Sequence, residues 1–132
     1  MIKLEKDEDI FKLILDNGEN RWNTQLVREI DAVLDEVEKS QGPAALVTSS
    51  SDNKFFSNGL DLDWISSAPS DERAAFTKEF MALMGRIITF SVPSICVVNG
   101  HAFGAGFMMA LAHDIRYTVS YTHLTLPTID PV

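Results

Sequence analysis

The sequence predicts an α/β fold in which buried strands alternate with amphipathic helices. Two short apolar runs, residues 44–48 and 94–98, have the composition of strands that are buried on both faces of a parallel sheet. Each run follows a helical pattern, so the chain is expected to have the order β-α-β-α-β-α-β. Parallel strands joined by helices cross over with a right-handed sense, and this order therefore favours a single α/β domain.

Alternation and turn residues predict the N-terminal elements. Residues 2–5 and 10–15 have the pattern of strands, and the polar cluster at residues 16–20 ends the second one. Asn23 or Thr24 then caps an amphipathic helix, which ends near residues 40–43. The residues expected on its buried face are Leu26, Val27, Ile30, Val33, Leu34 and Val37.

Polar breaks separate the later helices. Residues 61–65 are expected to form a short helix, and Ser70 is expected to cap a longer helix over residues 71–90. The buried stripe predicted on the longer helix consists of Phe76, Phe80, Leu83, Met84, Ile87 and Ile88. A last helix is expected over residues 104–113, followed by a strand over residues 115–119.

Composition narrows the class of function. A chain of 132 residues with 45% hydrophobic content can form one globular domain. Its formal net charge of −8, without a basic run, argues against nucleic acid as a partner. The acidic N-terminus argues against an export signal, and Asn99, His101 and three glycines interrupt the longest apolar stretch, which argues against a membrane span. Cys96 is expected in the core, and no metal-ligand spacing is present.

Two glycine-containing turns lead to the functional prediction. The turns lie at residues 55–61 and 99–106, and each follows a strand-like run and opens a helix. The backbone N–H groups of Leu60 and Ala105 can then point at one oxygen. This arrangement is an oxyanion hole, which stabilises the negative charge that develops on a thioester carbonyl when a proton leaves the adjacent carbon.

The glycines in these turns have two interpretations. Gly59 and Gly104 allow the backbone to turn and a ligand to approach closely, and the helix that begins near Gly104 adds the positive end of its dipole. Alternatively, both segments are ordinary strand-to-helix turns. Neither segment matches a phosphate-binding loop or a dinucleotide-binding fingerprint.

The two turns resemble the oxyanion segments of the crotonase family, the enoyl-CoA hydratases and isomerases. The second resemblance extends over residues 93–116, and residues 20–24 resemble a segment whose backbone helps hold the CoA adenine. The resemblance covers about residues 2–117 and implies a crotonase-like ββα spiral core, truncated in this chain. It further implies an acyl-CoA thioester as ligand, with coenzyme A as part of the substrate and no separate cofactor. Full-length members form a homotrimer or a dimer of trimers.

The resemblance also implies the residues of the site. Leu60 and Ala105 are expected to be catalytic through their backbone N–H groups. The expected substrate-binding residues are Trp22, Thr24, Ser57, Gly59, Asp61, Leu62, Gly104 and Met108. Trp22 has an alternative role as a core aromatic residue, and Asp61 is more simply the cap of the following helix. His101 and His113 lie at the ends of elements, where a hydrogen bond to the backbone is expected.

Met108 bears on the type of reaction. Hydratases of the family add water with two glutamates, and one of these lies three positions after the second oxyanion residue, where this chain has Met108. The methionine favours an isomerase of fatty-acid β-oxidation, which moves a proton from the α to the γ carbon of a 3-enoyl-CoA with a single carboxylate. The alternatives are a hydratase or another crotonase-type lyase or hydrolase, and a non-catalytic acyl-CoA-binding protein. The expected location is cytoplasmic in a bacterium, and peroxisomal or mitochondrial in a eukaryote.

The resemblance ends near Tyr117. Residues 119–128 read like the translation of a transposase adapter used in sequencing libraries. We therefore expect residues 1–118 to be the N-terminal part of a crotonase-fold domain and residues 119–132 to be a non-native tail. Such a fragment would expose apolar surface, be poorly soluble and lack the family's carboxylate, and so be inactive. The alternative is an edge strand, because Leu124 and Leu126 alternate with polar residues.

Overall fold

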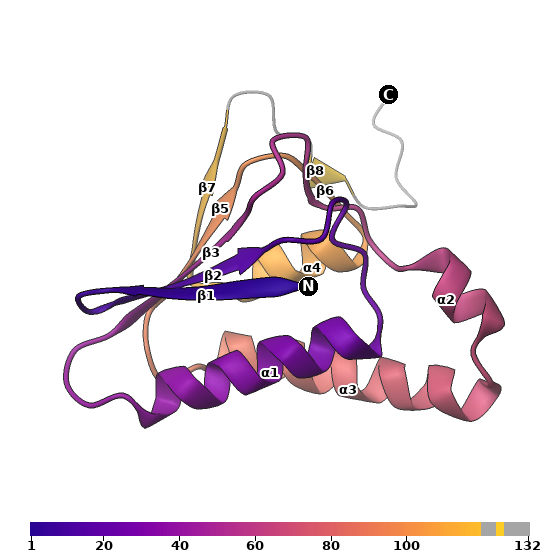
Figure 1. Cartoon of the computed structure of the whole chain (residues 1–132), viewed down its shortest axis with the longest axis horizontal. Helices are drawn as coiled ribbons and strands as arrows, with labels where there is room; N and C mark the ends of the chain where they lie inside the picture. The colour runs from indigo at the N-terminus through magenta and orange to yellow at the C-terminus, as the bar shows by residue number, and fades with distance from the viewer. Residues whose placement is uncertain (120–123, 126–132) are drawn as a thin grey trace.

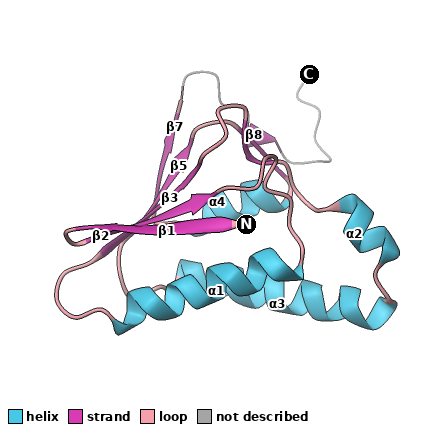
Figure 2. Ribbon diagram, in the orientation of Figure 1, coloured by secondary structure: helices cyan, strands magenta, loops and turns pink. Residues whose placement is uncertain are grey.

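The structure is a computed structural model that describes residues 1–119 and 124–125 (Figure 1). Pairs of strands alternate with helices, which agrees with the predicted α/β class but adds strands to the predicted order (Figure 2). The strands are β1 (Ile2–Asp7), β2 (Ile10–Leu15), β3 (Ala45–Ser50), β4 (Phe55–Ser57), β5 (Ser94–Val98), β6 (His101–Phe103), β7 (Ile115–Thr118) and β8 (Leu124–Thr125). The helices are α1 (Thr24–Lys39), α2 (Leu62–Ser67), α3 (Ser70–Ile88) and α4 (Ala105–Ala112).

The strands form two sheets. The larger sheet has the order β1-β2-β3-β5-β7, in which β1 is antiparallel to β2 and the other pairs are parallel. The smaller sheet has the order β4-β6-β8, and its pairs are parallel. The chain repeatedly passes from a strand of the larger sheet to one of the smaller sheet and then to a helix. This repeat confirms the predicted α/β class and the ββα spiral.

The helices α1 and α3 lie side by side under the larger sheet in the view of Figure 1. All six residues predicted for the apolar face of α1 are buried, and Asn23 is the cap, since its side chain accepts a hydrogen bond from the Leu26 N–H. Arg86 of α3 forms ion pairs of 2.7 and 2.8 Å with Asp31 and Asp35 of α1. Partial burial lowers the pKa of Arg86, but the hydrogen bonds to these carboxylates more than offset it, so the pKa of Arg86 is raised.

Two predictions about α3 were wrong. Ser70 is the first residue of the helix and not its cap, because Pro69 occupies the cap position and no side chain caps this end. The acidic Asp71 and Glu72 lie in the first turn instead, where they face the positive end of the helix dipole. Ile88 is 61% exposed, because the last turn rotates it away from the face that buries Ile87.

The remaining elements differ from prediction in small ways. The strands β4 and β6 are only three residues long and lie within the segments that the sequence assigns to turns. Strand β7 ends at Thr118, so Val119 is outside it. Cys96 is buried in the core, as expected, and burial raises the pKa of its thiol to about 12. Of the predicted tail, residues 120–123 and 126–132 lie outside the described residues, and its non-native origin stays a prediction.

Candidate functional site

The smaller sheet brings the two glycine segments together. Strand β4 begins the first segment and β6 lies within the second, and the two strands pair in parallel with Phe55 opposite His101 and Ser57 opposite Ala102. Each of these strands follows a neighbouring strand of the larger sheet, β3 and β5. Two turns that are distant in the sequence therefore share one end of the sheet, as an oxyanion hole made from both of them requires.

Close contacts between the two segments explain why glycine is needed. A Cβ atom at Gly106 would lie 2.4 Å from the Ser57 carbonyl oxygen, and one at Gly100 would lie 2.7 Å from the Lys54 carbonyl oxygen. Both clashes involve backbone atoms, so a change of rotamer cannot relieve them. The second segment consequently packs directly on the backbone of the first.

The Leu60 N–H is directed by a short parallel bridge to Trp22. Trp22 donates its N–H to the Gly59 carbonyl over 2.8 Å and accepts the Asp61 N–H over 2.9 Å. In a parallel bridge these bonds come from the residues on either side of the paired residue, so the N–H of Leu60 points to the opposite side. Among the described residues it has no backbone or side-chain acceptor. Gly59 makes this turn with φ of +89°, a conformation that favours glycine.

The Ala105 N–H lies at the start of helix α4. Ala105 is the first helical residue, and Gly104 before it has φ of +50° and no side-chain capping bond. The first N–H groups of a helix lack partners within the helix, and within residues 1–119 and 124–125 the Ala105 N–H has no acceptor. This N–H, at the positive end of the helix, is thus available to a ligand.

Leu60 and Ala105 line the same cavity, which has a volume of about 290 Å³. Gly104 and Met108 also line it, so it gathers four of the residues that the sequence assigns to the site. Helix α3 supplies the opposite wall through Thr77, Phe80 and Met81. The Thr77 hydroxyl donates to the Arg73 carbonyl over 3.1 Å, which leaves the wall largely apolar. The cavity thus combines a largely apolar wall with two lining residues whose N–H groups have no acceptor among the described residues.

Three predicted substrate-binding residues support this cavity from outside. Trp22 is fully buried and packs edge-on against Phe80 with 5.1 Å between ring centroids, so it stands behind the cavity wall. Ser57 is also buried, and its hydroxyl donates to the Asn20 carbonyl over 2.8 Å. Gly59 lies against the Phe103 carbonyl, which would be 3.3 Å from a Cβ atom at this position.

The other three predicted substrate-binding residues lie outside the apolar cavity; they are Asp61, Leu62 and Thr24. Asp61 caps α2, because its carboxylate accepts the Trp64 N–H over 3.1 Å, and this confirms the structural alternative for that residue. Leu62 is 62% exposed and lines a polar hollow of about 300 Å³ beside Asp61. Thr24 begins α1 and lines a third cavity, of about 270 Å³, together with Trp64.

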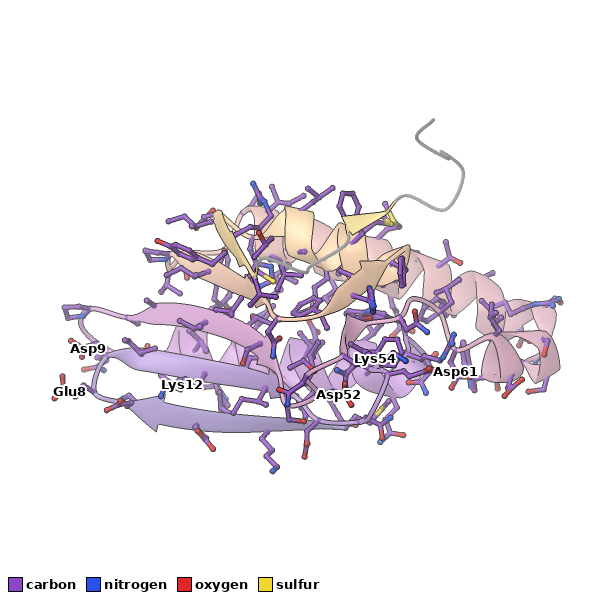
Figure 3. All side chains as sticks on the ribbon, turned by 90° about the horizontal axis from the view of Figure 1, so that it is seen from above. Glu8, Asp9, Lys12, Asp52, Lys54 and Asp61 are labelled. Carbon is purple, nitrogen blue, oxygen red and sulfur yellow. The ribbon has the colours of Figure 1, made fainter. Side chains whose placement is uncertain are left out.

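Charged side chains lie at the β1–β2 hairpin and at the turn before β4. Figure 3 shows Glu8 and Asp9 at the far end of the β1–β2 hairpin, and Asp52 and Lys54 at the turn before β4. The Asp52 carboxylate accepts the N–H groups of Phe55 and Lys54, over 2.9 and 2.7 Å, and these bonds lower its pKa. Asp52 therefore shapes the entry to β4.

His113 anchors the end of helix α4. Its Nδ1 lies 2.8 Å from the Met109 carbonyl oxygen, so this nitrogen donates, and Nε2 accepts from the Thr48 hydroxyl over 2.8 Å. The expected bond to the backbone is confirmed. Burial lowers the pKa of His113, which keeps the ring neutral.

Sequence reasoning missed the contribution of α3 to the cavity and the burial of Asn20. The apolar stripe predicted on α3 was a signal for its contribution, but such a stripe does not tell which of its residues line a cavity. Two features are absent from the part of the chain that the structure describes. No helix there is long and apolar enough to cross a bilayer, and no cluster of three histidine, cysteine or acidic residues there could hold a metal ion.

Comparison with known proteins gives a family match over most of the chain. The family model described as enoyl-CoA hydratase/isomerase matches residues 5–130. The peroxisomal enoyl-CoA delta isomerase 2 of Arabidopsis thaliana is 32% identical over 120 residues, which cover 86% of this chain and 50% of that protein. A probable enoyl-CoA hydratase of Bacillus subtilis (strain 168) is 28% identical, over 98% of this chain and 50% of the relative.

The fold also matches solved structures. The enoyl-CoA hydratase of Geobacillus kaustophilus HTA426 superposes with a TM-score of 0.90 at 25% identity, over 96% of this chain and 48% of that one. The chain thus spans about half the length of the relatives that it matches. With a family model that covers most of its residues, the chain belongs to the enoyl-CoA hydratase/isomerase family.

Proposed function

We propose that this chain carries the oxyanion side of an enoyl-CoA isomerase site, in which Leu60 and Ala105 donate their N–H groups to the thioester oxygen of an acyl-CoA. The observation that carries the proposal is the cavity that both residues line. Its apolar wall suits an acyl chain, and its two N–H groups suit the carbonyl oxygen. Gly59 and Gly104 are proposed to let the thioester approach the backbone.

The proposed reaction moves a double bond through a thioester enolate. A base takes a proton from the α carbon of the 3-enoyl-CoA, and the electron pair passes to the thioester oxygen, where the two N–H groups stabilise the charge. When the enolate collapses, the double bond forms between the α and β carbons and the proton is returned to the γ carbon. Each N–H donor is worth about 10²–10³ in rate.

Met108 supports isomerisation over hydration. It lines the cavity at the position where the resemblance places one of the two glutamates of a hydratase. A methionine thioether cannot act as an acid or base toward water. The single carboxylate of an isomerase is proposed to come from sequence that follows Tyr117 in the whole protein. No cofactor enters this proposal, because coenzyme A is part of the substrate.

We propose that the enzyme acts in fatty-acid β-oxidation. The whole protein is proposed to assemble as a homotrimer or a dimer of trimers. The proposed location is cytoplasmic in a bacterium, and peroxisomal or mitochondrial in a eukaryote, as the names of two relatives state for those proteins.

The test begins with the source sequence. The locus is amplified and sequenced without transposase adapters, through the codon for Tyr117, and the resulting protein is assayed. We expect 3-enoyl-CoA to be converted to 2-enoyl-CoA faster than 2-enoyl-CoA is hydrated. Tight acyl-CoA binding without proton exchange at the α carbon would instead indicate a binding protein, and faster hydration would indicate a hydratase.

A pair of proline variants tests the donor at Ala105. Proline is tolerated at the first position of a helix, where its missing N–H has no helical partner. Ala105→Pro should therefore retain the fold but lower kcat by about 10²–10³. The matched control, Ser70→Pro, places proline at the exposed first position of α3 and should leave kcat unchanged. Equal activity of both variants would show that the Ala105 N–H does not stabilise the enolate.

A further inference from the structure

A buried polar link, which we call the amide bridge, joins the two glycine segments through Asn20, Ser50 and Asn99. The Asn20 side chain donates from Nδ2 to the Ser50 hydroxyl over 2.8 Å. The Asn99 side chain donates to the Ser50 carbonyl over 2.9 Å and accepts the Ser50 N–H over 3.3 Å. Ser50 is the last residue of β3, so the centre of the amide bridge is fixed to the larger sheet.

The Asn20 end of the amide bridge holds the first glycine segment. The Asn20 Nδ2 also donates to the Phe56 carbonyl over 2.9 Å. The backbone carbonyl of Asn20 accepts a hydrogen bond from the Ser57 hydroxyl over 2.8 Å. These bonds fix two consecutive residues just before the turn that presents Leu60. The Asn99 end comes directly before Gly100 and β6, which lead to Ala105.

Asn20 belongs to a loop, yet it is buried and has a positive φ. It is 1% exposed and has φ of +51°, in the left-handed region that asparagine tolerates better than most residues. Its Oδ1 accepts the Asn17 N–H over 2.9 Å, so both amide hydrogens and the amide oxygen are bonded. Several hydrogen bonds from its surroundings thus hold Asn20 in a backbone conformation that few residues adopt. Such residues gather at functional sites.

We propose that Asn20 is a positioning residue, which sets the Leu60 N–H relative to the Ala105 N–H through the amide bridge. The inference rests on the proposed function of those two donors. An oxyanion donor acts only when it lies about 2.7–3.1 Å from the oxygen, and a misplacement of about 1 Å can cost about 10² in rate. Without the side-chain amide of Asn20, the Phe56 carbonyl loses its bond and the link from the first segment to Ser50 is broken. The first segment is then held only by the bond from the Ser57 hydroxyl to the backbone carbonyl of Asn20, and it can shift relative to the second.

The test compares three variants. Asn20→Gly removes the amide but keeps access to positive φ, so the backbone conformation is not the variable. Asn17→Ala changes an exposed side chain of the same loop. Leu34→Ala removes a fully buried core side chain of α1, away from the cavity, and controls for a loss of stability alone.

Two measurements separate positioning from folding. The first is the carbonyl stretching frequency of hexanoyl-CoA labelled with carbon-13 at the thioester carbon, bound to each protein, because hydrogen bonds from the two donors lower this frequency. The second is the kinetic pair kcat and KM for 3-enoyl-CoA, measured on the whole protein from the re-sequenced locus, because this chain alone is expected to be inactive. For Asn20→Gly we expect the lowered frequency to be largely lost and kcat to fall about 10- to 100-fold, with KM changed less than about threefold. Both control variants should keep the lowered frequency.

The outcomes distinguish the two proposals. If the thioester bound to the unaltered protein has the same frequency as the free thioester, the oxyanion assignment itself fails. If that protein lowers the frequency and Asn20→Gly lowers it equally, the oxyanion assignment stands and the positioning role of Asn20 is overturned. A loss of the shift in Leu34→Ala as well as in Asn20→Gly would also overturn it, because general destabilisation would then explain the effect.

Discussion

Two helical glycines in this chain should respond to alanine in opposite ways. Gly106 lies in the first turn of α4, where an added Cβ would be 2.4 Å from the Ser57 carbonyl oxygen and 2.6 Å from the Ser57 Cβ. Gly85 lies within α3, and an added Cβ there would meet nothing within 4 Å. Comparing alanine at these two positions therefore isolates the effect on stability of the contact between α4 and β4.

The expected magnitudes follow from two opposing effects. Alanine is favoured over glycine inside a helix by about 1 kcal/mol, and this gain applies to both positions. At Gly106 the overpacking costs about 3 kcal/mol, at the upper end of the usual range, because backbone atoms of Ser57 must move. We expect Gly106→Ala to lower the free energy of unfolding by about 2 kcal/mol and Gly85→Ala to raise it by about 0.5–1 kcal/mol.

Urea denaturation followed by far-ultraviolet circular dichroism measures both values. Acyl-CoA binding should also weaken in Gly106→Ala, because the displaced contact separates the two glycine segments, and should be unchanged in Gly85→Ala. A Gly106→Ala protein as stable as the unaltered chain would refute the close packing of α4 on β4. A similar loss in both variants would instead show that the contact at Ser57 is not its cause.

Two further predictions concern pH and helix capping. Burial holds the pKa of His113 below its ordinary value of 6.5, so the unfolded chain binds this proton more readily. The stability that neutral His113 provides is present above about pH 6.5 and is lost as the pH falls, by at most about 1.4 kcal/mol per pH unit. His113→Gln should flatten this part of the stability curve in urea titrations between pH 5 and about pH 7, and an unchanged slope would contradict the assignment. Asn23→Ala should lower the free energy of unfolding by about 0.5–2 kcal/mol, whereas Asn23→Asp keeps the capping oxygen. Equal stability of these two variants would show that the cap does not contribute.

Local patterns were sufficient to predict much of the fold. The six buried residues of α1 and its cap at Asn23 depend on spacing within one helix, and the sequence displays that spacing directly. The same holds for the cap of α2 at Asp61 and for strand β2, whose bounds match the prediction. Ile88 was mispredicted because spacing alone does not specify where the neighbouring element ends.

Long-range pairing accounts for what could not be predicted. Strands β4 and β6 have three residues each, too few to display alternation, and they are strands because they pair within the smaller sheet. The cavity wall from α3 likewise depends on how the helix lies against α4. Asn20 belongs to a polar turn cluster in which each residue has the composition of a loop. Its burial results from Ser50 and Phe56, which are distant in the sequence.

The bridge between Trp22 and Leu60 gives the protein an intrinsic optical probe. Trp22 is one of two tryptophans; it is fully buried, and its indole N–H has no hydrogen-bond partner among residues 1–119 and 124–125. Indole in such a dry environment emits at short wavelength. Trp64→Phe would leave Trp22 as the single fluorophore, bonded on both sides of Leu60 and packed on Phe80. Its emission would then report, without any label, whether the turn that presents Leu60 is in place.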